Sequence, residues 1–192
     1  MSPLVRFGNA LGAGSLGLAL AAAFGLQFLM HELPCPLCLV QRVAIALCGF
    51  GFVLNLRLGT QPSHYGLVLL SALFGLAASS RQVMLHIVPG TGAYGSAAFG
   101  LHLYSWGVLL FVAVIAGVAV LMILSGSGRH DHMRNDAQAV AQFSGFSRLM
   151  TSLLIVMIFA NAIGAFAECG PFECPDNPTS YWIVQHLPGF MR

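Results

Sequence analysis

Five long runs of apolar residues follow one another along the chain, separated by short polar or Gly- and Pro-rich stretches. An α-helix rises about 1.5 Å per residue, so about 20 apolar residues cross the roughly 30 Å hydrocarbon core of a bilayer. Each run is long enough to do so. The pattern predicts one membrane domain with an external tail over 169–192 and helices over residues 9–31, 35–56, 65–88, 102–124 and 148–168.

The composition supports a membrane protein. Of the 192 residues, 57% are hydrophobic and 7% are charged, whereas soluble domains carry about 25% charged residues. A soluble domain of this composition would lack the polar side chains to cover its surface. We therefore predict an all-α integral membrane protein with a four-helix-bundle core and a fifth transmembrane helix. The net charge of +2, without a basic run, gives no indication of nucleic-acid binding.

The first apolar run has a cleaved signal peptide as its alternative, because Ala21-Ala22-Ala23 supplies small residues. The apolar region of a signal peptide is usually about 7–15 residues long. This run is longer and continues past the alanines to Met30. A retained first helix is therefore the prediction.

Two connections between the runs are longer than simple turns. Residues 89–101 are rich in Gly, Ala and aromatic residues, and are too short and broken to span a bilayer. We expect them to form an interfacial or re-entrant segment. Residues 125–147 form the one long polar segment, in which His130 and His132 are expected to be solvated.

The placement of charges predicts the orientation in the membrane. With five spans, one side collects Arg6, Arg57, Arg129, Arg134 and Arg148, and the other collects Glu32, Glu168, Glu173 and Asp176. Arginine is enriched on the cytoplasmic side of membrane proteins. The N-terminus is therefore predicted to be cytoplasmic and both close cysteine pairs external. In a bacterium this means the inner membrane, with the cysteines in the oxidising periplasm.

Cys35 and Cys38 form a Cys-x-x-Cys pair at the start of the second apolar run. This arrangement is typical of an exchangeable disulfide, because a helix N-terminus stabilises the reacting thiolate. Cys38 lies further into the helix and is predicted to receive more of this stabilisation. A static disulfide and half of a metal site are the alternatives. A disulfide that closes so short a loop restrains little chain entropy, which makes a static staple a weak use of the pair.

Arg42 follows Cys38 by one helical turn and is expected on the same helix face. Its charge would lie about 6 Å deeper along the helix axis. A cation buried in a membrane is costly and usually functional. Arg42 is therefore predicted to stabilise the Cys38 thiolate or to polarise a carbonyl group of a lipid-soluble ligand. The alternative is an interfacial arginine whose side chain extends to the lipid headgroups.

Cys169 and Cys174 directly follow the last apolar run. Their short loop favours either a structural disulfide or a second redox pair that passes electrons to Cys35 and Cys38 by thiol–disulfide exchange. Four cysteines on one side of the membrane would also suit tetrahedral zinc. Cys48 lies about 15 Å beyond Cys38 along the helix and is predicted to be a packing residue.

His86 and His102 flank the Gly-rich segment at the external ends of two predicted helices. Each is a ligand of haem, a hydrogen-bond donor to a quinone oxygen, or an interfacial side chain without a binding role. Arg81 lies about a turn and a half before His86. It is either a second cation near the site or an anchor at the end of its helix.

The chain resembles the DsbB family of membrane disulfide-bond formation proteins in the stretch Pro34-Cys35-Pro36-Leu37-Cys38. Arg42 follows Cys38 by four residues, and a membrane helix is predicted on each side of the stretch. The stretch Arg81-Gln82-Val83-Met84-Leu85 is a second and less specific match. The resemblance covers about the first hundred residues.

The resemblance implies a thiol:quinone oxidoreductase in the lipid bilayer. Such an enzyme reoxidises a periplasmic DsbA-like thiol oxidase and passes two electrons to the membrane quinone pool, either ubiquinone or menaquinone. Cys38 would face the quinone, Cys35 would exchange with the partner, and Arg42 would position or polarise the quinone. The further candidates for quinone binding are Arg81, His86 and His102.

One feature departs from the common family pattern, which has four membrane helices and a second cysteine pair in the external loop after the third. Residues 89–101 contain no cysteine here, and the other external pair, Cys169 and Cys174, follows a fifth apolar run. We predict that this pair replaces the missing one in the electron relay. The alternatives are a metal- or haem-binding membrane protein and a non-catalytic membrane subunit stapled by disulfides. A vitamin K epoxide reductase type is less favoured, because its cysteine pair is expected late in the bundle.

Overall fold

Five long helices make up most of the computed structural model, which describes residues 1–88, 90, 92, 95, 97–126, 145–175 and 178–186. The long helices are α1 (Pro3–Leu29), α2 (Pro36–Leu58), α3 (Pro62–His86), α4 (Leu103–Gly126) and α6 (Gly145–Cys169). The short elements are β1 (Ala97–Ala98), β2 (Leu101–His102) and α7 (Trp182–His186). All five long helices are long and apolar enough to cross a membrane. The predicted all-α membrane fold is confirmed.

Proline and glycine define several of the helix ends. Pro3, Pro36 and Pro62 each stand in the first turn of a helix, where an N–H would have no partner within the helix. Gly170 ends α6 with a φ of 64° and donates its N–H to the Phe166 carbonyl oxygen at 2.8 Å. A left-handed residue after the last helical one is a common helix terminator. These ends bring both cysteine pairs to helix termini.

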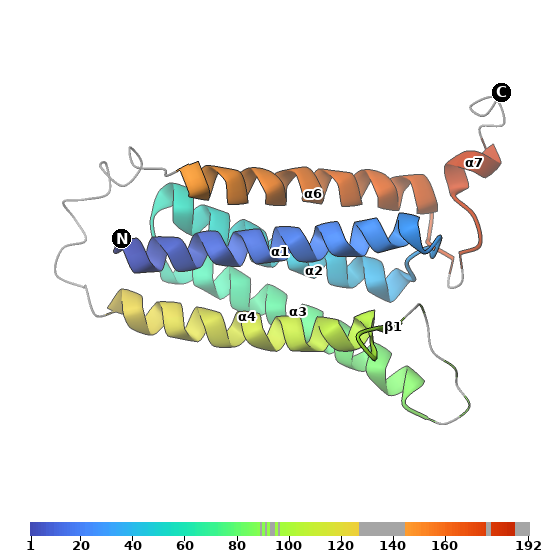
Figure 1. Ribbon diagram of the computed structural model, residues 1–192, viewed down its shortest axis with the longest axis horizontal. Coiled ribbons are helices and arrows are strands. Elements are labelled where there is room, and N and C mark those ends of the chain that lie inside the picture. Colours follow the sequence, from blue (N-terminus) through green and yellow to red (C-terminus); the bar gives the residue numbers. More distant parts are fainter. Residues whose placement is uncertain are drawn as a thin grey trace.

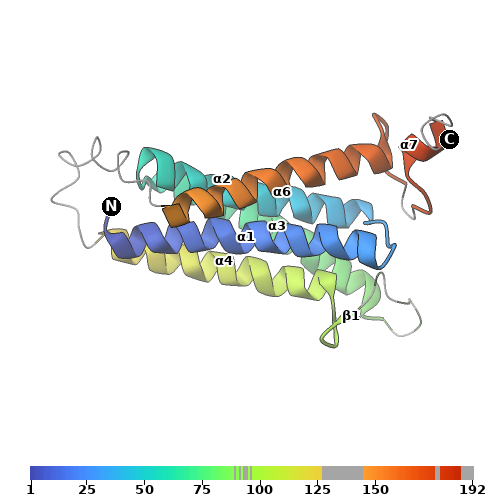
Figure 2. The same ribbon diagram turned by 45° about the horizontal axis from the view of Figure 1, so that its top comes forward.

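Helices α1 to α4 form a bundle, and α6 lies along its outside against α1 and α2 (Figures 1 and 2). The core contains buried apolar side chains from every long helix, among them Leu16, Phe52, Val68, Phe111 and Leu154. Gly17 lets α6 approach α1 closely, because a Cβ atom there would lie 3.1 Å from the main-chain nitrogen of Leu154. Large apolar side chains on every long helix are also exposed at the bundle surface, as lipid contact requires.

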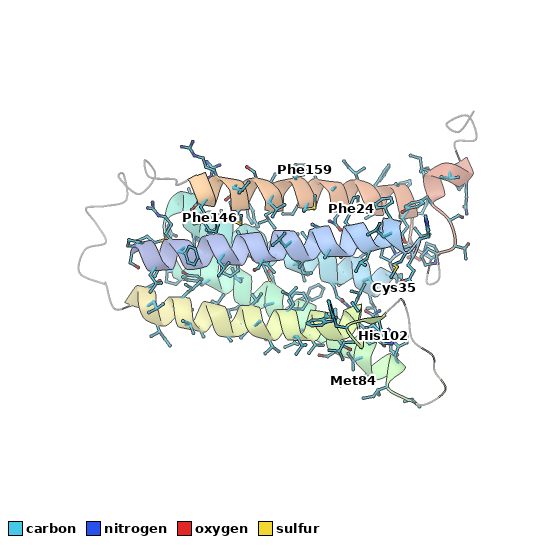
Figure 3. All side chains as sticks on the ribbon, in the orientation of Figure 1. Phe24, Cys35, Met84, His102, Phe146 and Phe159 are labelled. Carbon is cyan, nitrogen blue, oxygen red and sulfur yellow. A yellow bond between two sulfur atoms is a disulfide. The ribbon has the colours of Figure 1, made fainter. Side chains whose placement is uncertain are left out.

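The bundle has two ends with different contents. The N-terminus, the turn between α2 and α3 and the start of α6 lie at one end, here called the N-terminal end (Figure 1). The start of α2 with Cys35, the end of α3 and the end of α6 lie at the other, here called the cysteine end (Figures 1 and 3). Both cysteine pairs therefore lie at the same end of the bundle.

The connection between α3 and α4 contains a small β-hairpin, which the sequence did not predict. Ala97 pairs with His102 and Ala98 with Leu101 in an antiparallel arrangement. Phe99 lies at its turn and is 97% exposed. The described residues leave out part of 89–101 and all of the polar residues 127–144. His130 and His132, which were predicted to be solvated, therefore lie outside the described residues. The interfacial placement of the connection between α3 and α4 stays a prediction.

Candidate functional site

Cys35 and Cys38 are free thiols at the N-terminus of α2. Cys35 is the N-cap residue and its Sγ accepts a hydrogen bond from the Cys38 N–H at 3.2 Å. An N-cap side chain normally accepts from the second or third helical residue, and Cys38 is the third. The structure directs this one amide to Cys35, and the prediction that the helix terminus stabilises Cys38 more than Cys35 stays a prediction.

The two sulfurs differ in how easily they lose a proton. The adjacent Cys38 sulfur, followed by burial, raises the pKa of the Cys35 thiol above its ordinary value. Two close thiols do not both ionise readily, because the two negative charges would repel. The positive charge of Arg42 acts on the Cys38 sulfur. Of the two thiols, Cys35 is therefore the one that this arrangement favours in the protonated form.

Gln82 connects the two thiols from the neighbouring helix α3. Its side chain is 1% exposed, and its Nε2 lies 3.3 Å from Cys35 Sγ and 3.5 Å from Cys38 Sγ. Gln41 Nε2 donates to Gln82 Oε1 at 2.6 Å, which fixes the amide with its N–H groups toward the sulfurs. These donors favour a negative charge on either sulfur. We did not single out Gln82 from the sequence, although a polar residue in an apolar span is a signal of function.

Arg42 is held by two other helices. Its Nη1 donates to Gln27 Oε1 at 2.8 Å and to Asn161 Oδ1 at 3.1 Å, and its Nη2 donates to the Ala23 carbonyl oxygen at 3.0 Å. Ala23 and Gln27 belong to α1 and Asn161 belongs to α6. The side chain therefore points between helices, and does not extend to the headgroups. Its charge acts on Cys38 and on Glu168.

Comparison with known proteins identifies the family. A family model described as disulfide bond formation protein DsbB matches residues 5–94. A protein of Dechloromonas aromatica named disulfide bond formation protein B is 30% identical over 149 residues, which cover 59% of this chain and 88% of the relative. This chain belongs to the DsbB family. The match to the family model includes α1, α2 and α3 with Cys35, Cys38 and Arg42, and ends before α4.

Two further relatives also carry the name disulfide bond formation protein B. The one from Chromohalobacter salexigens is 36% identical over 93 residues, which cover 44% of this chain and 52% of the relative. The one from Nitrosomonas eutropha is 37% identical over 110 residues, which cover 53% and 65%. The chain thus spans less than two thirds of these two relatives. No solved structure matches the chain significantly.

In this DsbB-family chain, α6 adds a carboxyl group to the site. From the sequence we assigned Glu168 to the same side of the membrane as both cysteine pairs, but we did not predict its burial. Helix α6 continues to Cys169, so its last turn packs against the bundle and leaves Glu168 2% exposed. Asn161, which binds Arg42, precedes Glu168 by seven residues and lies on the same helix face. Glu168 Oε2 is buried without a hydrogen-bond partner among the described residues.

The tail after α6 returns to the same site. Cys169 and Cys174 form a disulfide with their Cα atoms 4.6 Å apart. The Trp182 ring covers Gly170, where a Cβ atom would lie 2.5 Å from the indole. Next to it, the Tyr181 hydroxyl accepts a hydrogen bond from Gln27 Nε2 at 3.0 Å. Because Gln27 also accepts from Arg42, the tail contributes to the polar surroundings of the arginine.

His86 and His102 both pack against one aromatic ring, that of Tyr104. Each stacks on Tyr104 with ring centroids 5.3 Å apart. His86 Nδ1 lies 2.8 Å from the main-chain oxygen of Gln82, which links this stack to the thiols. Arg81 is exposed on α3, while the next residue, Gln82, points inward. The structure thus brings Cys35, Cys38 and Arg42 together and leaves Arg81 at the surface.

The four cysteines at the cysteine end are not arranged as a zinc site. Cys169 and Cys174 are bonded to each other. Within the described ranges, no group of three His, Cys, Asp or Glu side chains is placed to hold a metal ion. The zinc alternative therefore finds no support in this part of the chain.

Proposed function

We propose that this chain is a thiol:quinone oxidoreductase that supports disulfide-bond formation. It reoxidises a periplasmic DsbA-like thiol oxidase and passes two electrons through Cys35 and Cys38 to a membrane quinone, ubiquinone or menaquinone. The observation that carries the proposal is the thiol pair at a membrane-helix terminus, with Gln82 against both sulfurs and Arg42 one turn deeper. The name of the relatives, disulfide bond formation protein B, supports it.

The proposal includes an orientation in the bacterial inner membrane. The N-terminal end carries Arg6, Arg57 and Arg148, and arginine is enriched on the cytoplasmic side. The cysteine end then faces the periplasm, where thiol oxidation is favoured. This places the thiols where a periplasmic partner reaches them and keeps them beside lipid-soluble electron acceptors.

Cys35 is the proposed site of exchange with the thiol partner. A partner thiolate attacks Cys35 Sγ of the oxidised pair and forms a mixed disulfide, with Cys38 leaving as a thiolate. The second partner thiol then resolves the mixed disulfide, so the partner leaves oxidised and Cys35 and Cys38 are reduced. Cys35 is 8% exposed, so the attack requires local opening. Residues 31–35 are not helical, which allows this opening without unwinding a helix.

The disulfide Cys169–Cys174 is proposed to stand between the partner and Cys35. Its location at the cysteine end supports this role, as does its position beside a non-helical tail. In the relay, the partner first reduces Cys169–Cys174, and a tail thiolate then attacks Cys35 Sγ. The alternative within the same function is direct attack of the partner on Cys35, with a structural tail disulfide.

The residues beside Cys38 fit a quinone. Ser79 Oγ is fully buried and has no hydrogen-bond partner among the described residues. Gly107 lets α4 pack closely against it, since a Cβ atom there would lie 2.8 Å from Ser79 Oγ and 3.2 Å from Gln41 Oε1, so a quinone at this hydroxyl would need α4 to shift. The hydroxyl of Ser79 is proposed to donate a hydrogen bond to one carbonyl oxygen of the quinone. Arg42, whose hydrogen bonds go to α1 and α6, is proposed to polarise the quinone through its charge. A bound quinone would supply the two-electron acceptor for the dithiol.

The protein side chains have separate parts in this half of the reaction. Arg42 stabilises negative charge beside Cys38, and Gln82 keeps its N–H groups on the sulfurs. The stack of His86, Tyr104 and His102 is proposed to border the acceptor. Arg81, which is exposed, is proposed as an anchor at the end of α3.

The test is thiol trapping of the purified protein in lipid, with a reduced DsbA-like protein and with or without added quinone. We expect both cysteine pairs to become reduced and to reoxidise only with quinone. Cys38→Ser should lower turnover by at least about 1,000-fold, as removal of a catalytic nucleophile does. Cys48→Ser is the matched control, because Cys48 is buried in the core of the same helix.

The outcomes separate the versions of the proposal. Cycling of Cys35 and Cys38 while Cys169–Cys174 stays oxidised would overturn the relay and leave direct exchange with Cys35. If neither pair cycles with quinone present, the oxidoreductase proposal is wrong.

A further inference from the structure

Glu168 is a buried carboxyl group that the proposed thiol chemistry does not use. It is 2% exposed, and its Oε2 has no hydrogen-bond partner among the described residues. Buried polar atoms are nearly always paired in folded proteins, because an unpaired one has lost its water without compensation. A carboxyl group in this position therefore requires an explanation.

The ionisable groups around Glu168 come from the elements that pack against α6. Helix α2 contributes Arg42 and Cys38, and both act electrostatically on Glu168. The tail contributes Tyr181, which also acts on Arg42, and α7 carries His186, which stacks on Trp182. Helix α1 has one ionisable side chain, Arg6, at the opposite end. Arg42 is therefore the cation of this group.

The hydrogen bonds of Arg42 leave its charge without a direct anionic partner. They go to two side-chain amides and one main-chain carbonyl, all neutral. A charge buried at membrane depth is costly, and a nearby opposite charge lowers that cost. When Cys35 and Cys38 form a disulfide, the Glu168 carboxylate is the group that balances Arg42. When Cys38 carries a thiolate, the same site holds two negative charges against one positive charge.

We propose that Glu168 takes up a proton when the Cys35–Cys38 disulfide is reduced, so that Arg42 faces one negative charge in each redox state. The inference rests on Cys35 and Cys38 being the redox pair of the proposed function. Reduction by two electrons and two protons converts the disulfide to a Cys35 thiol and a Cys38 thiolate. One proton goes to Cys35 and the other goes to Glu168.

Reoxidation reverses these charges. Both electrons leave the sulfurs as the Cys35–Cys38 bond forms again. The Cys35 thiol and the Glu168 carboxylic acid each lose a proton, so that the site gives up the two electrons and two protons that a bound quinone would accept. Glu168 thus acts through the charge of Arg42 as a positioning residue. It also keeps one of the two required protons inside the site.

The test needs no quinone. Infrared difference spectra between the oxidised and reduced protein should show the carbonyl band of a protonated carboxylic acid appearing on reduction. The band should be present in the wild type and absent in Glu168→Gln, which is close in shape but cannot take up the proton. Glu173→Gln is the matched control, because Glu173 is an exposed carboxylate of the same tail, and it should retain the band.

Proton release on reduction provides a second readout. A phosphine converts a disulfide to two thiols without a net change in protons. The wild type should therefore release none, because Glu168 captures the proton that Cys38 gives up. Glu168→Gln should release one proton per molecule. The tail disulfide contributes equally to both proteins. Equal proton release by both, or a carboxyl band that persists in Glu168→Gln, would overturn the inference.

These results are independent of turnover. A wild type that transfers electrons to quinone but shows no band contradicts the role of Glu168 alone. A wild type that shows the band but has no quinone-dependent turnover contradicts the proposed function alone. If Glu168→Gln does not fold, Glu168→Asp replaces it. Its band should appear at a shifted frequency, and an unshifted band would assign the signal to another carboxyl and overturn the inference.

Discussion

Two clusters of buried polar side chains lie at opposite ends of the same bundle. At the N-terminal end, Asn9 Nδ2 donates to the Tyr65 hydroxyl at 3.0 Å and to the Val5 carbonyl oxygen at 2.8 Å. Asn55 Nδ2 donates to Asn9 Oδ1 at 3.0 Å. Asn55 Oδ1 accepts from the Gln61 N–H at 3.2 Å and lies 3.1 Å from His64 Nδ1.

The cluster at the cysteine end is less completely bonded. Two of the three buried side-chain atoms without partners in the described part of the chain, Ser79 Oγ and Glu168 Oε2, lie there, and the third, Thr151 Oγ1, lies in the first half of α6, outside both clusters. The Gln82 amide donates to sulfur, a weak acceptor. A satisfied polar network holds helices in one arrangement, whereas unsatisfied groups are costly and persist mainly where chemistry or a ligand uses them. The N-terminal cluster is therefore expected to set stability, and the cysteine-end cluster to set activity.

The largest effect is expected from removing Arg42, the cation of the cysteine-end cluster. Arg42→Gln removes the positive charge that acts on Cys38. Loss of one preorganised electrostatic group usually lowers the rate by about 100-fold or more, and we expect that loss in quinone-dependent kcat/KM. Arg42→Lys keeps the charge but not the forked hydrogen bonds to α1 and α6, so it should lose about tenfold.

The matched control is Arg57→Gln, an exposed arginine near the other end of the same helix. It should retain wild-type turnover. A loss in Arg57→Gln equal to that in Arg42→Gln would mean that total charge, and not the position of Arg42, controls the rate.

The second effect breaks the N-terminal cluster. Asn55→Ala removes the bonds to Asn9, Gln61 and His64. Side-chain hydrogen bonds inside membrane proteins average about 0.6 kcal/mol each, so we expect a loss of about 2 kcal/mol in the free energy of unfolding. Turnover per folded molecule should be unchanged. The measurement is reversible unfolding in mixed detergent beside an activity assay, and reduced turnover with unchanged stability would reverse the assignment of the two clusters.

The sequence was sufficient for the number of long apolar helices and for the proximity of Cys35, Cys38 and Arg42. Apolar length identifies spans because the bilayer sets it, and Cys35, Cys38 and Arg42 are close in sequence, so one helix positions all three. The helix limits were less certain. We expected the first helix over 9–31, whereas α1 covers Pro3–Leu29, because Arg6 and Asn9 interrupt an apolar run without interrupting a helix.

The partners of the site required the structure. Gln27, Asn161 and Gln82 come from three different helices, and an apolar pattern gives neither the neighbours of a helix nor its rotation. The sequence predicted the side of the membrane for Glu168, but not its burial. Its burial depends on how α6 packs beside the bundle, which residues 5–94 of the family match do not include.

The smallest expected effect tests the difference between the two clusters, because the change in the free energy of unfolding should have the opposite sign. Ser79→Ala removes a fully buried hydroxyl that has no partner among the described residues. Loss of an unsatisfied buried polar group should raise the free energy of unfolding by about 0.5–1 kcal/mol, opposite in direction to Asn55→Ala.

If the hydroxyl serves the electron acceptor, the same variant should raise the KM for quinone by about threefold, the effect of one modest hydrogen bond. Ser15→Ala is the control, because the exposed Ser15 hydroxyl bonds only within its own helix, to Gly12, and should change neither quantity. If Ser79→Ala lowers the free energy of unfolding, the Ser79 hydroxyl contributes to stability. The boundary between stabilising and active polar groups would then not fall between the two ends of the bundle.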